Sequence, residues 1–337
     1  MKKRILILYT GGTIGMEPSE QGYVPVAGFD RLLQKLLRSR AAQQLPDYEV
    51  LEFDNLIDSA NLVPADWTLI ATKIEQHWAD YDGFIVLHGT DTMAYTASAL
   101  SFMLKGTDKP VILTGSQIPL AELRNDALDN LVTALFLAGN YPIPEVCIYF
   151  NGRLLRGNRS CKLKSMGFDA FDSPNFPWLG QVGIHIDLHE NLLLEKSDPE
   201  FYIREFNPSA VCIMPIYPGI PARILDRVLD QHDVRGLILQ SYGVGNPPDA
   251  NQKFISTLEQ ASARGVVVLN ITQCLQGPVN QGAYATGATL NRIGVVPGSD
   301  LTLEAAFAKM HFLISQNLES DSIRSELQHS LCGESSG

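Results

Sequence analysis

Short apolar runs that end in glycine turns constrain the fold of this chain more than any other feature. In the first half, four runs read as buried strands: 5–9, 84–88, 111–114 and 146–150. Amphipathic stretches with helical spacing lie between them, at 65–79, 93–105 and 126–139. Because strands alternate with helices, we predict a mostly parallel sheet that helices cover on both faces.

A second alternating series follows a charged, aperiodic segment. Its predicted strands are 211–216, 237–240 and 266–270, and its predicted helices are 222–231, 250–264 and 303–316, the last capped by Asp300 or Thr302. We therefore predict a two-domain α/β protein, with a larger N-terminal domain and a smaller C-terminal α/β domain that has its own parallel sheet. The expected boundaries are 1–188 for the first domain, 189–208 for a linker and 209–337 for the second domain. We expect the tail, residues 332–337, to be frayed.

The charge balance and cysteine pattern argue against several classes of protein. The chain has 26 Lys and Arg against 37 Asp and Glu, a net charge of −11, and no basic run, so nucleic-acid binding lacks electrostatic support. No run of about 18 apolar residues predicts a membrane span. Five scattered cysteines without a C-x-x-C pair are typical of reduced thiols, and the short apolar run after Lys2-Lys3-Arg4 is no signal peptide. We expect a cytoplasmic protein.

Two of the strands lead into turns rich in hydroxyl groups. These turns are Thr10-Gly11-Gly12-Thr13-Ile14 and His88-Gly89-Thr90-Asp91-Thr92. Ligands bind beyond the carboxyl ends of strands in open α/β sheets, so Thr13, Thr90 and Asp91 are candidates for chemistry. Two threonines and a carboxylate favour acyl transfer over cofactor chemistry, and G-G-T-I-G is neither a dinucleotide nor a P-loop motif. The alternative for the second turn is a helix cap by Thr90 or Asp91.

Other polar residues receive structural interpretations. His88 lies two residues before Thr90, where alternation would put both side chains on one face, but we expect the turn to redirect Thr90. The segment from Phe168 to Asp172 reads as a loop with Phe168 and Phe171 packed inward and Asp169 and Asp172 solvated. The sequence has no H-E-x-x-H, no Cys/His cluster and no EF-hand loop, so we expect neither a metal nor another cofactor.

The paired turns resemble the two signature motifs of the bacterial-type L-asparaginase family. Further similar stretches are Asp58-Ser59, Thr114-Gly115-Ser116-Gln117, Lys162 and Gly243-Val244-Gly245-Asn246. The resemblance spans nearly the whole chain, and without an export signal the chain is similar to the cytoplasmic, type I branch. The resemblance implies an amidohydrolase that converts L-asparagine to L-aspartate and ammonia through an acyl-threonine intermediate.

The resemblance also implies catalytic roles. Thr13 matches the nucleophile, and Tyr23 matches a tyrosine on a mobile lid over the site. Thr90, Asp91 and Lys162 match a second catalytic cluster, in which a partly desolvated lysine can accept a proton through a neighbouring threonine. Which group is the base in each half-reaction stays open. Without the resemblance, Tyr23 reads as a loop aromatic and Lys162 as a surface cation.

Substrate contacts follow from the same resemblance. Thr90 and Asp91 match substrate-binding residues, and the Asp91 carboxylate can accept charge-assisted hydrogen bonds from an α-ammonium group. Asp58 and Ser59 match a substrate-binding turn, and the alternative is an Asx or Ser turn, which is common in loops. The backbone N–H of Ser116 is a candidate oxyanion donor. Asn246 matches a loop that approaches the site of a neighbouring subunit, which implies a homodimer or homotetramer.

Three alternatives stay open. A glutaminase-asparaginase of mixed specificity differs by one substrate methylene, a discrimination of only ~1–3 kcal/mol. The asparaginase-like subunit of a tRNA-dependent amidotransferase would normally bring added domains, and the acidic balance argues against tRNA. A non-catalytic amino-acid sensor would need neither a nucleophile nor a proton shuttle.

Overall fold

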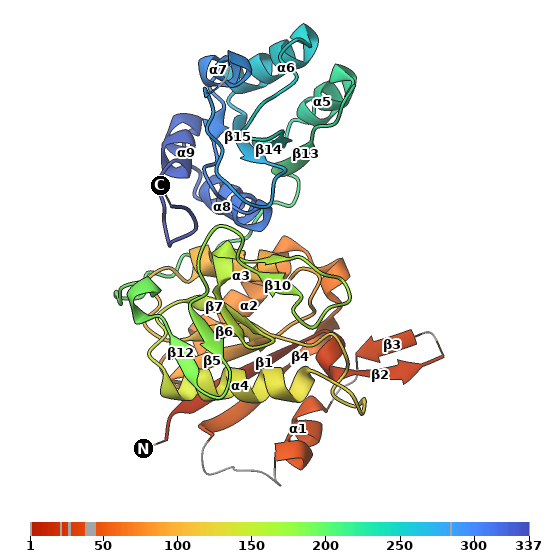
Figure 1. The fold of residues 1–337 in the computed structure, drawn as a ribbon, viewed down its shortest axis with the longest axis vertical. Helices are drawn as coiled ribbons and strands as arrows, with labels where there is room; N and C mark the ends of the chain where they lie inside the picture. The colour runs from red at the N-terminus through yellow and green to blue at the C-terminus, as the bar shows by residue number, and fades with distance from the viewer. Residues whose placement is uncertain (1, 21, 26–27, 38–44, 284, 337) are drawn as a thin grey trace. The chain divides into compact units, whose positions relative to one another are not determined.

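The chain forms two compact units, residues 1–203 and 204–337, each with its own sheet (Figure 1). The structure is a computed structural model that describes residues 2–20, 22–25, 28–37, 45–283 and 285–336. The predicted α/β class, with a mostly parallel first sheet and a parallel second sheet, is confirmed. None of the helices in these ranges has the length and hydropathy needed to cross a lipid bilayer.

The first unit contains an eight-stranded sheet in the order β12-β11-β8-β7-β6-β5-β1-β4. Its parallel strands are β1 (Arg4–Gly11), β4 (Asp47–Ile57), β5 (Gly83–Leu87), β6 (Val111–Thr114) and β7 (Val146–Phe150). The antiparallel strands β8 (Arg153–Arg156), β11 (Gly180–Val182) and β12 (Ile186–Leu188) extend one edge. The sheet order reverses at β1, which lies between β4 and β5. Ligand crevices in open α/β sheets form at such a reversal.

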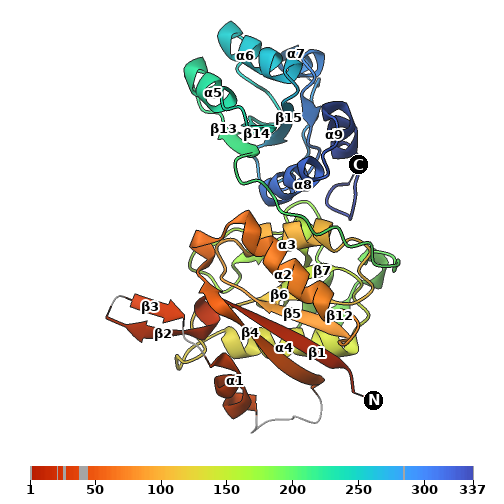
Figure 2. The ribbon, with the colours of Figure 1, turned by 180° about the vertical axis from the view of Figure 1, so that it is seen from behind.

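Helices cover both faces of this sheet, as the apolar runs require (Figures 1 and 2). Helix α4 (Ala127–Asn140) packs on one face, and α2 (Pro64–Gln76) and α3 (Met93–Met103) lie together on the other. On the α4 face, Ile5 and Ile7 of β1 join Leu131 and Leu135 of α4 in one buried cluster. Because every residue from Ile5 to Tyr9 is buried, β1 reads as a continuous apolar run rather than an alternating one.

Smaller elements complete the first unit. Strands β2 (Met16–Ser19) and β3 (Gly22–Pro25) form an antiparallel hairpin that projects from the unit, and β9 (Cys161–Lys162) pairs with β10 (Phe171–Asp172). Helix α1 spans Phe29–Leu37, and short 3₁₀ turns include η1 (Thr13–Gly15), η2 (Ser59–Asn61), η3 (Gly157–Arg159) and η4 (Glu190–Leu192).

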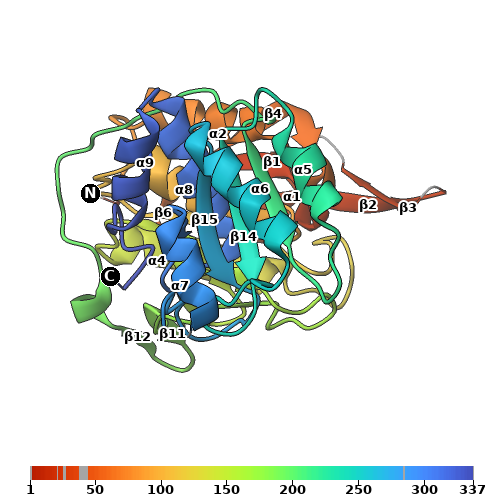
Figure 3. The same cartoon turned by 90° about the horizontal axis from the view of Figure 1, so that it is seen from above.

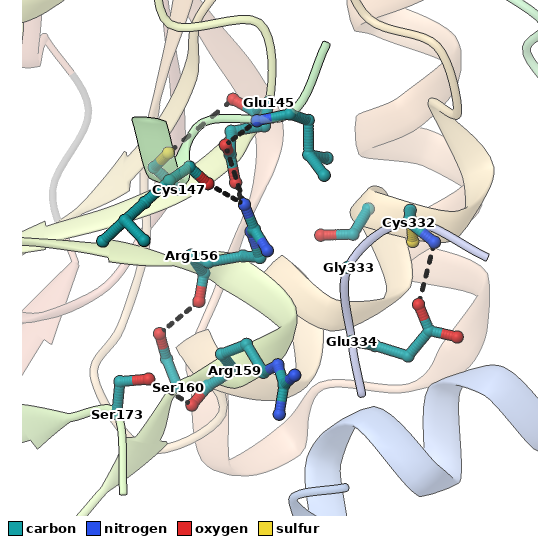
Figure 4. Close-up of polar contacts among 12 residues, drawn as sticks. Glu145, Cys147, Arg156, Arg159, Ser160, Ser173, Cys332, Gly333 and Glu334 are labelled. Carbon is teal, nitrogen blue, oxygen red and sulfur yellow. Dashed lines mark hydrogen bonds and ion pairs between the residues drawn. The ribbon is translucent and has the colours of Figure 1, made fainter. Parts of the chain in front are cut away.

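A buried ion pair holds the chain that leaves the first sheet. Arg156 Nε donates to Glu145 Oε2 over 2.7 Å, and both side chains are almost fully buried (Figure 4). The same two residues bind the backbone of the following segment: Arg156 donates to the Leu192 carbonyl, and Glu145 accepts from the Leu194 N–H. The start of the predicted linker is therefore fixed to the first unit. No helix or strand is assigned from residue 193 to residue 210.

The second unit is a four-stranded parallel sheet between two layers of helices (Figure 3). Its strands, in spatial order, are β13 (Val211–Pro215), β14 (Gly236–Ser241), β15 (Val267–Thr272) and β16 (Val296–Pro297). Its helices are α5 (Ala222–Leu229), α6 (Gln252–Ala263), α7 (Ala285–Arg292), α8 (Leu303–Ser315) and α9 (Ser320–Leu327). The expected Thr302 cap of α8 is confirmed, because Thr302 Oγ1 accepts from the Ala305 N–H.

The expectation that the C-terminal tail is frayed is wrong for its described part. Glu334 is fully buried and pairs with the equally buried Lys309 over 2.7 Å, and it accepts from the Cys332 N–H (Figure 4). Burial alone would raise the pKa of Glu334, but the Lys309 ammonium and the hydrogen bonds from the Cys332 and Leu331 N–H groups together lower it. Ser336 also bonds Asp300 through its N–H and its hydroxyl. A buried charge needs its partner, so these contacts hold the tail in place.

Candidate active site

The turns that follow three neighbouring strands, β5, β1 and β4, lie against one another at the carboxyl ends of these strands. Gly12, after β1, approaches the second turn so closely that a Cβ atom there would lie 2.6 Å from the Gly89 Cα. A Cβ atom at Gly89 would in turn lie 2.6 Å from the Ser59 Cβ, in the turn after β4. Gly12 also has φ of 84°, which side chains other than glycine rarely tolerate. Backbone contact therefore brings the turns of Thr13, Ser59 and Thr90 together.

A lysine from a distant part of the chain completes a hydrogen-bonded cluster. Lys162 Nζ donates to Thr90 Oγ1 over 2.8 Å and to Asp91 Oδ1 over 2.7 Å. The Lys162 side chain is 18% exposed and that of Asp91 is 61% exposed, so the cluster opens to solvent on the carboxylate side. The structure thus joins the three residues that the resemblance grouped. Lys162 engages Asp91 Oδ1, and among the described residues Oδ2 has no partner, so this second oxygen can face a ligand cation.

Gln117 is the member of this cluster that the sequence analysis left without a role. Its Oε1 accepts from the Thr90 hydroxyl over 3.1 Å, and its Nε2 donates to the carbonyls of Ser165 and Gly167. The Thr90 hydroxyl therefore accepts a hydrogen bond from Lys162 and donates one to Gln117. The side chain also ties the turn after β6 to the loop that follows Lys162. The sequence pointed to Gln117 only as part of the family-like stretch Thr114-Gly115-Ser116-Gln117.

His88 has a structural environment, as we expected from its place at the strand end. Its Nδ1 lies 2.7 Å from the Gly89 carbonyl, and its Nε2 lies 3.0 Å from Thr96 Oγ1. Trp67 Nε1 donates to that same hydroxyl, which leaves the hydroxyl proton for Nε2. The ring is then neutral, with its proton on Nδ1. Both ring nitrogens have partners other than Thr90, and burial lowers the pKa of His88 to about 4.

This histidine makes stability depend on pH. The pKa is 6.5 in the unfolded chain and about 4 in the folded one, so between these values the unfolded chain binds a proton that the folded chain does not. The contribution of His88 to the free energy of unfolding should therefore fall as pH falls from 6.5 to 4, by about 1.4 kcal/mol per pH unit. His311, whose pKa burial also lowers to about 4, adds a similar contribution. Glu304, whose pKa burial raises to about 7, contributes with the opposite sign.

Urea unfolding at several pH values between 7 and 4 measures this slope. We expect His88→Asn to be less stable at pH 7 and to lose about half of the wild-type slope that the two histidines produce. An unchanged slope would show that His88 is protonated in the folded chain.

The predicted nucleophile and the predicted lid residue lie on adjoining elements. Thr13 begins η1, which β3 contacts, and Tyr23 lies on β3. Thr13 is partly exposed, and within the described ranges its hydroxyl makes no hydrogen bond. Tyr23 is 51% exposed, and its hydroxyl donates to Glu122 over 3.0 Å, a bond that raises the pKa of Tyr23. Glu122 is a contact that the sequence did not suggest.

The remaining first-unit candidates fall in two turns. Asp58 Oδ1 accepts from the Ala60 N–H over 3.1 Å, which is the Asx turn named as the structural alternative. Ser59 is 4% exposed, and its carbonyl accepts from Thr92. Ser116 is 1% exposed, and its hydroxyl lacks a partner in the described ranges. A buried hydroxyl without a partner is costly, so it marks a place where a ligand or water can bind.

Asn246 lies in the second unit, whereas all the other candidates lie in the first. It closes the tight turn after β14, where its N–H donates to the Tyr242 carbonyl over 2.8 Å. The turn is anchored to its own sheet because Asn270 donates to the Gly245 carbonyl.

The interpretation of the 168–172 loop is wrong in two respects. Phe171 is buried as expected, but Phe168 is 39% exposed. Both aspartates form ion pairs with Arg153 instead of being only solvated, because Arg153 projects from β8 between them. Within the described ranges, no group of three His, Cys, Asp or Glu residues is placed to hold a metal ion.

A separate concavity of about 320 Å³ lies at the opposite end of the first sheet. It is lined by residues next to the amino ends of β1, β5 and β6, among them Lys3, Asp82 and Pro110. It contains none of the residues singled out above. Two of its three lysines have partners: Lys3 pairs with Asp82, and Lys109 donates to backbone carbonyls of Trp78 and Tyr81.

Two family models cover most of the chain. "Asparaginase, N-terminal" matches residues 4–194, and "Glutaminase/Asparaginase C-terminal domain" matches residues 210–327. The chain belongs to the bacterial-type L-asparaginase family. Within that family it belongs to the type I branch: L-asparaginase 1 of Escherichia coli is 50% identical over 333 residues, which is 99% of this chain and 98% of that protein.

Solved asparaginase structures share the whole fold. The crystal structure of L-asparaginase I from Vibrio cholerae superposes with a TM-score of 0.91 at 46% identity, covering 100% of both chains. The thermostable L-asparaginase from Thermococcus kodakarensis superposes with a TM-score of 0.90 at 31% identity, covering 99% of both.

Proposed function

We propose that this chain hydrolyses L-asparagine to L-aspartate and ammonia. The observation that carries the proposal is the cluster of Thr90, Asp91 and Lys162 beside the turn of Thr13. The family match supports it, because the relatives with full-length coverage are L-asparaginases.

The chemistry would run in two half-reactions. Thr13 Oγ1 attacks the carboxamide carbon and loses its proton to a base, and the resulting oxyanion needs N–H donors such as the Ser116 backbone. Collapse of the tetrahedral intermediate expels ammonia, whose nitrogen takes up a proton, and leaves an acyl-threonine. Water then attacks the acyl carbon, gives up a proton, and releases aspartate and the Thr13 hydroxyl.

The roles within the site are part of the proposal. Thr13 is the nucleophile, Tyr23 covers it from the hairpin, and Thr90 with Lys162 relays protons. The free oxygen of Asp91 takes the α-ammonium of the substrate, and the turn of Asp58 and Ser59 receives the α-carboxylate.

An ammonia-release assay with asparagine and glutamine tests the function. We expect turnover of asparagine, and the ratio of kcat/KM for the two substrates decides between an asparaginase and a glutaminase-asparaginase of mixed specificity. Binding of asparagine without ammonia release would instead favour the amino-acid sensor and would sink the enzymatic proposal.

Asp91→Ala should weaken turnover by removing the partner of the α-ammonium. A charge-assisted hydrogen bond is worth about 1.5–3 kcal/mol, so kcat/KM for asparagine should fall roughly 10- to 150-fold. The control is a simple amide without α-groups, which should be a poor substrate for the wild type and should show little further loss in the variant. Equal losses on both substrates would mean that Asp91 acts through Lys162 and not on the α-ammonium.

We further propose that the site is completed by Asn246 of a second copy in a homodimer or homotetramer. The support is that Asn246 lies on the second unit while the other candidates lie on the first. Mixing Thr13→Ala with Asn246→Ala tests it, because a mixed dimer rebuilds one site with intact Thr13 and intact Asn246. Partial return of activity is expected after subunit exchange, whereas a fully active monomer would contradict the idea. The cytoplasmic location and the domain boundaries at residues 188 and 209 likewise remain proposals.

A further inference from the structure

Asp126 occupies the N-cap position of α4 but does not cap that helix. An aspartate at this position normally accepts hydrogen bonds from the first free N–H groups of its own helix. Here the Asp126 side chain makes no such bond. Asn125 does the capping instead, because its Oδ1 accepts from the N–H groups of Ala127 and Leu128 over 3.1 and 3.3 Å. The carboxylate of Asp126 is therefore committed elsewhere.

The carboxylate instead holds the turn after β6. Asp126 Oδ1 accepts from the N–H groups of Gln117 and Ile118 over 3.1 and 3.0 Å, and Oδ2 lies 3.0 Å from the same Gln117 nitrogen. Asn130, one helical turn later, donates to Asp126 Oδ2 and to the Gly115 carbonyl. Asp126 is 9% exposed and Asn130 is 3% exposed, so the hydrogen bonds that join α4 to this turn are buried.

Gln117 connects this turn to Thr90, whose hydroxyl is the proposed proton relay. The Gln117 backbone is fixed by Asp126, and the Gln117 side chain accepts from Thr90 over 3.1 Å. Thr90 in turn accepts from Lys162. Asp126 and Thr90 are therefore linked through Gln117, whose backbone N–H bonds the first and whose side chain bonds the second. A hydroxyl that relays protons has to point correctly, and small misplacements of catalytic groups are costly.

We propose that Asp126 is a positioning residue of the active site, which sets the direction of the Thr90 hydroxyl through Gln117. The proposal rests on the proposed role of Thr90 in asparagine hydrolysis. Asp126 would thus serve the reaction from a position where an aspartate normally serves only to cap a helix.

Asp126→Asn is the central test, measured by steady-state kinetics on asparagine beside a thermal melt. The amide keeps the size of the side chain but turns one acceptor oxygen into a donor that faces N–H groups. We expect kcat to fall by about 10- to 100-fold while KM changes less than about threefold. The matched control is Thr302→Ala, which removes a helix cap in the second unit and should lower the melting temperature without changing kcat.

Two further measurements keep every outcome decisive. In a Gln117→Ala background, Asp126→Asn should add little to the loss, because both act on one path; additive losses would overturn the route through Gln117. If Asp126→Asn does not fold, the same kinetics and thermal melt are measured on Asp126→Glu. This variant keeps the charge but displaces the carboxylate oxygens, so the same fall in kcat is expected. An unchanged kcat in the folded variant, or failure of both variants to fold, overturns the positioning role. Wild-type protein that releases no ammonia would instead refute the proposed function.

Discussion

Thr13→Ala should leave the chain folded and reduce asparagine hydrolysis by roughly 10⁴-fold or more, which is the loss typical of a removed nucleophile. The substitution removes only a hydroxyl and a methyl group from a partly exposed residue whose hydroxyl makes no hydrogen bond in the described ranges. Its structural cost should therefore be small. Circular dichroism and a thermal melt would establish that the variant folds, and ammonia release would measure the loss.

Thr13→Ser is the control for this result. It replaces the secondary hydroxyl of threonine with a primary hydroxyl in the same turn. The variant should keep measurable turnover with a transient acyl-enzyme, detectable by mass spectrometry after acid quenching. Turnover close to that of the wild type in Thr13→Ala would show that the acyl group is carried elsewhere or that water attacks directly.

Lys162→Met should reduce kcat by about 10²- to 10⁴-fold, the range expected for a lost proton-transfer group. Methionine fills a similar volume, but Thr90 loses its donor and Asp91 loses its cation. The effect should appear chiefly in kcat, since Asp91 keeps both oxygens for the substrate ammonium. Steady-state rates over a range of asparagine concentrations separate kcat from KM.

Lys164→Met is a closely matched control for this prediction. Lys164 lies two residues further along the chain, and its side chain is 52% exposed in an ion pair with Asp169. Exposed ion pairs contribute little, so this variant should retain full activity. Equal activity in both methionine variants would exclude Lys162 from the chemistry.

The central strands could be predicted from the sequence because burial on both faces leaves a clear apolar signature. The predicted runs 111–114 and 146–150 coincide with β6 and β7. Strand β4 was not among the predicted strands, because its sequence Asp-Tyr-Glu-Val-Leu-Glu-Phe-Asp-Asn-Leu-Ile mixes polar and apolar residues. It is an edge strand with several exposed side chains, so water on one side permits the polar residues.

Only the parts of the site that lie in local sequence motifs could be predicted from the sequence. The turns of Thr13 and Thr90 follow strands, so their nearness could be argued from the topology of parallel sheets. Lys162 lies 72 residues from Thr90, and nothing local distinguishes it from a surface lysine. Its inclusion depended on the family resemblance. Gln117 and Asp126 were missed because their roles arise from hydrogen bonds across the fold, which no spacing rule encodes.

The backbone contact between the turns of Gly12 and Gly89 limits how this enzyme can be redesigned. Because each turn is packed against the other without intervening side chains, a library that randomised these glycines would push the two turns apart. Variation that alters substrate range should be directed to exposed residues such as the half-exposed Tyr23 and to Leu123 and Met166. Leu123 follows Glu122, which binds Tyr23, and Met166 lies between the two carbonyls that bind Gln117. Directed evolution would then change exposed side chains near the site and leave the packed turns of Thr13 and Thr90 in place.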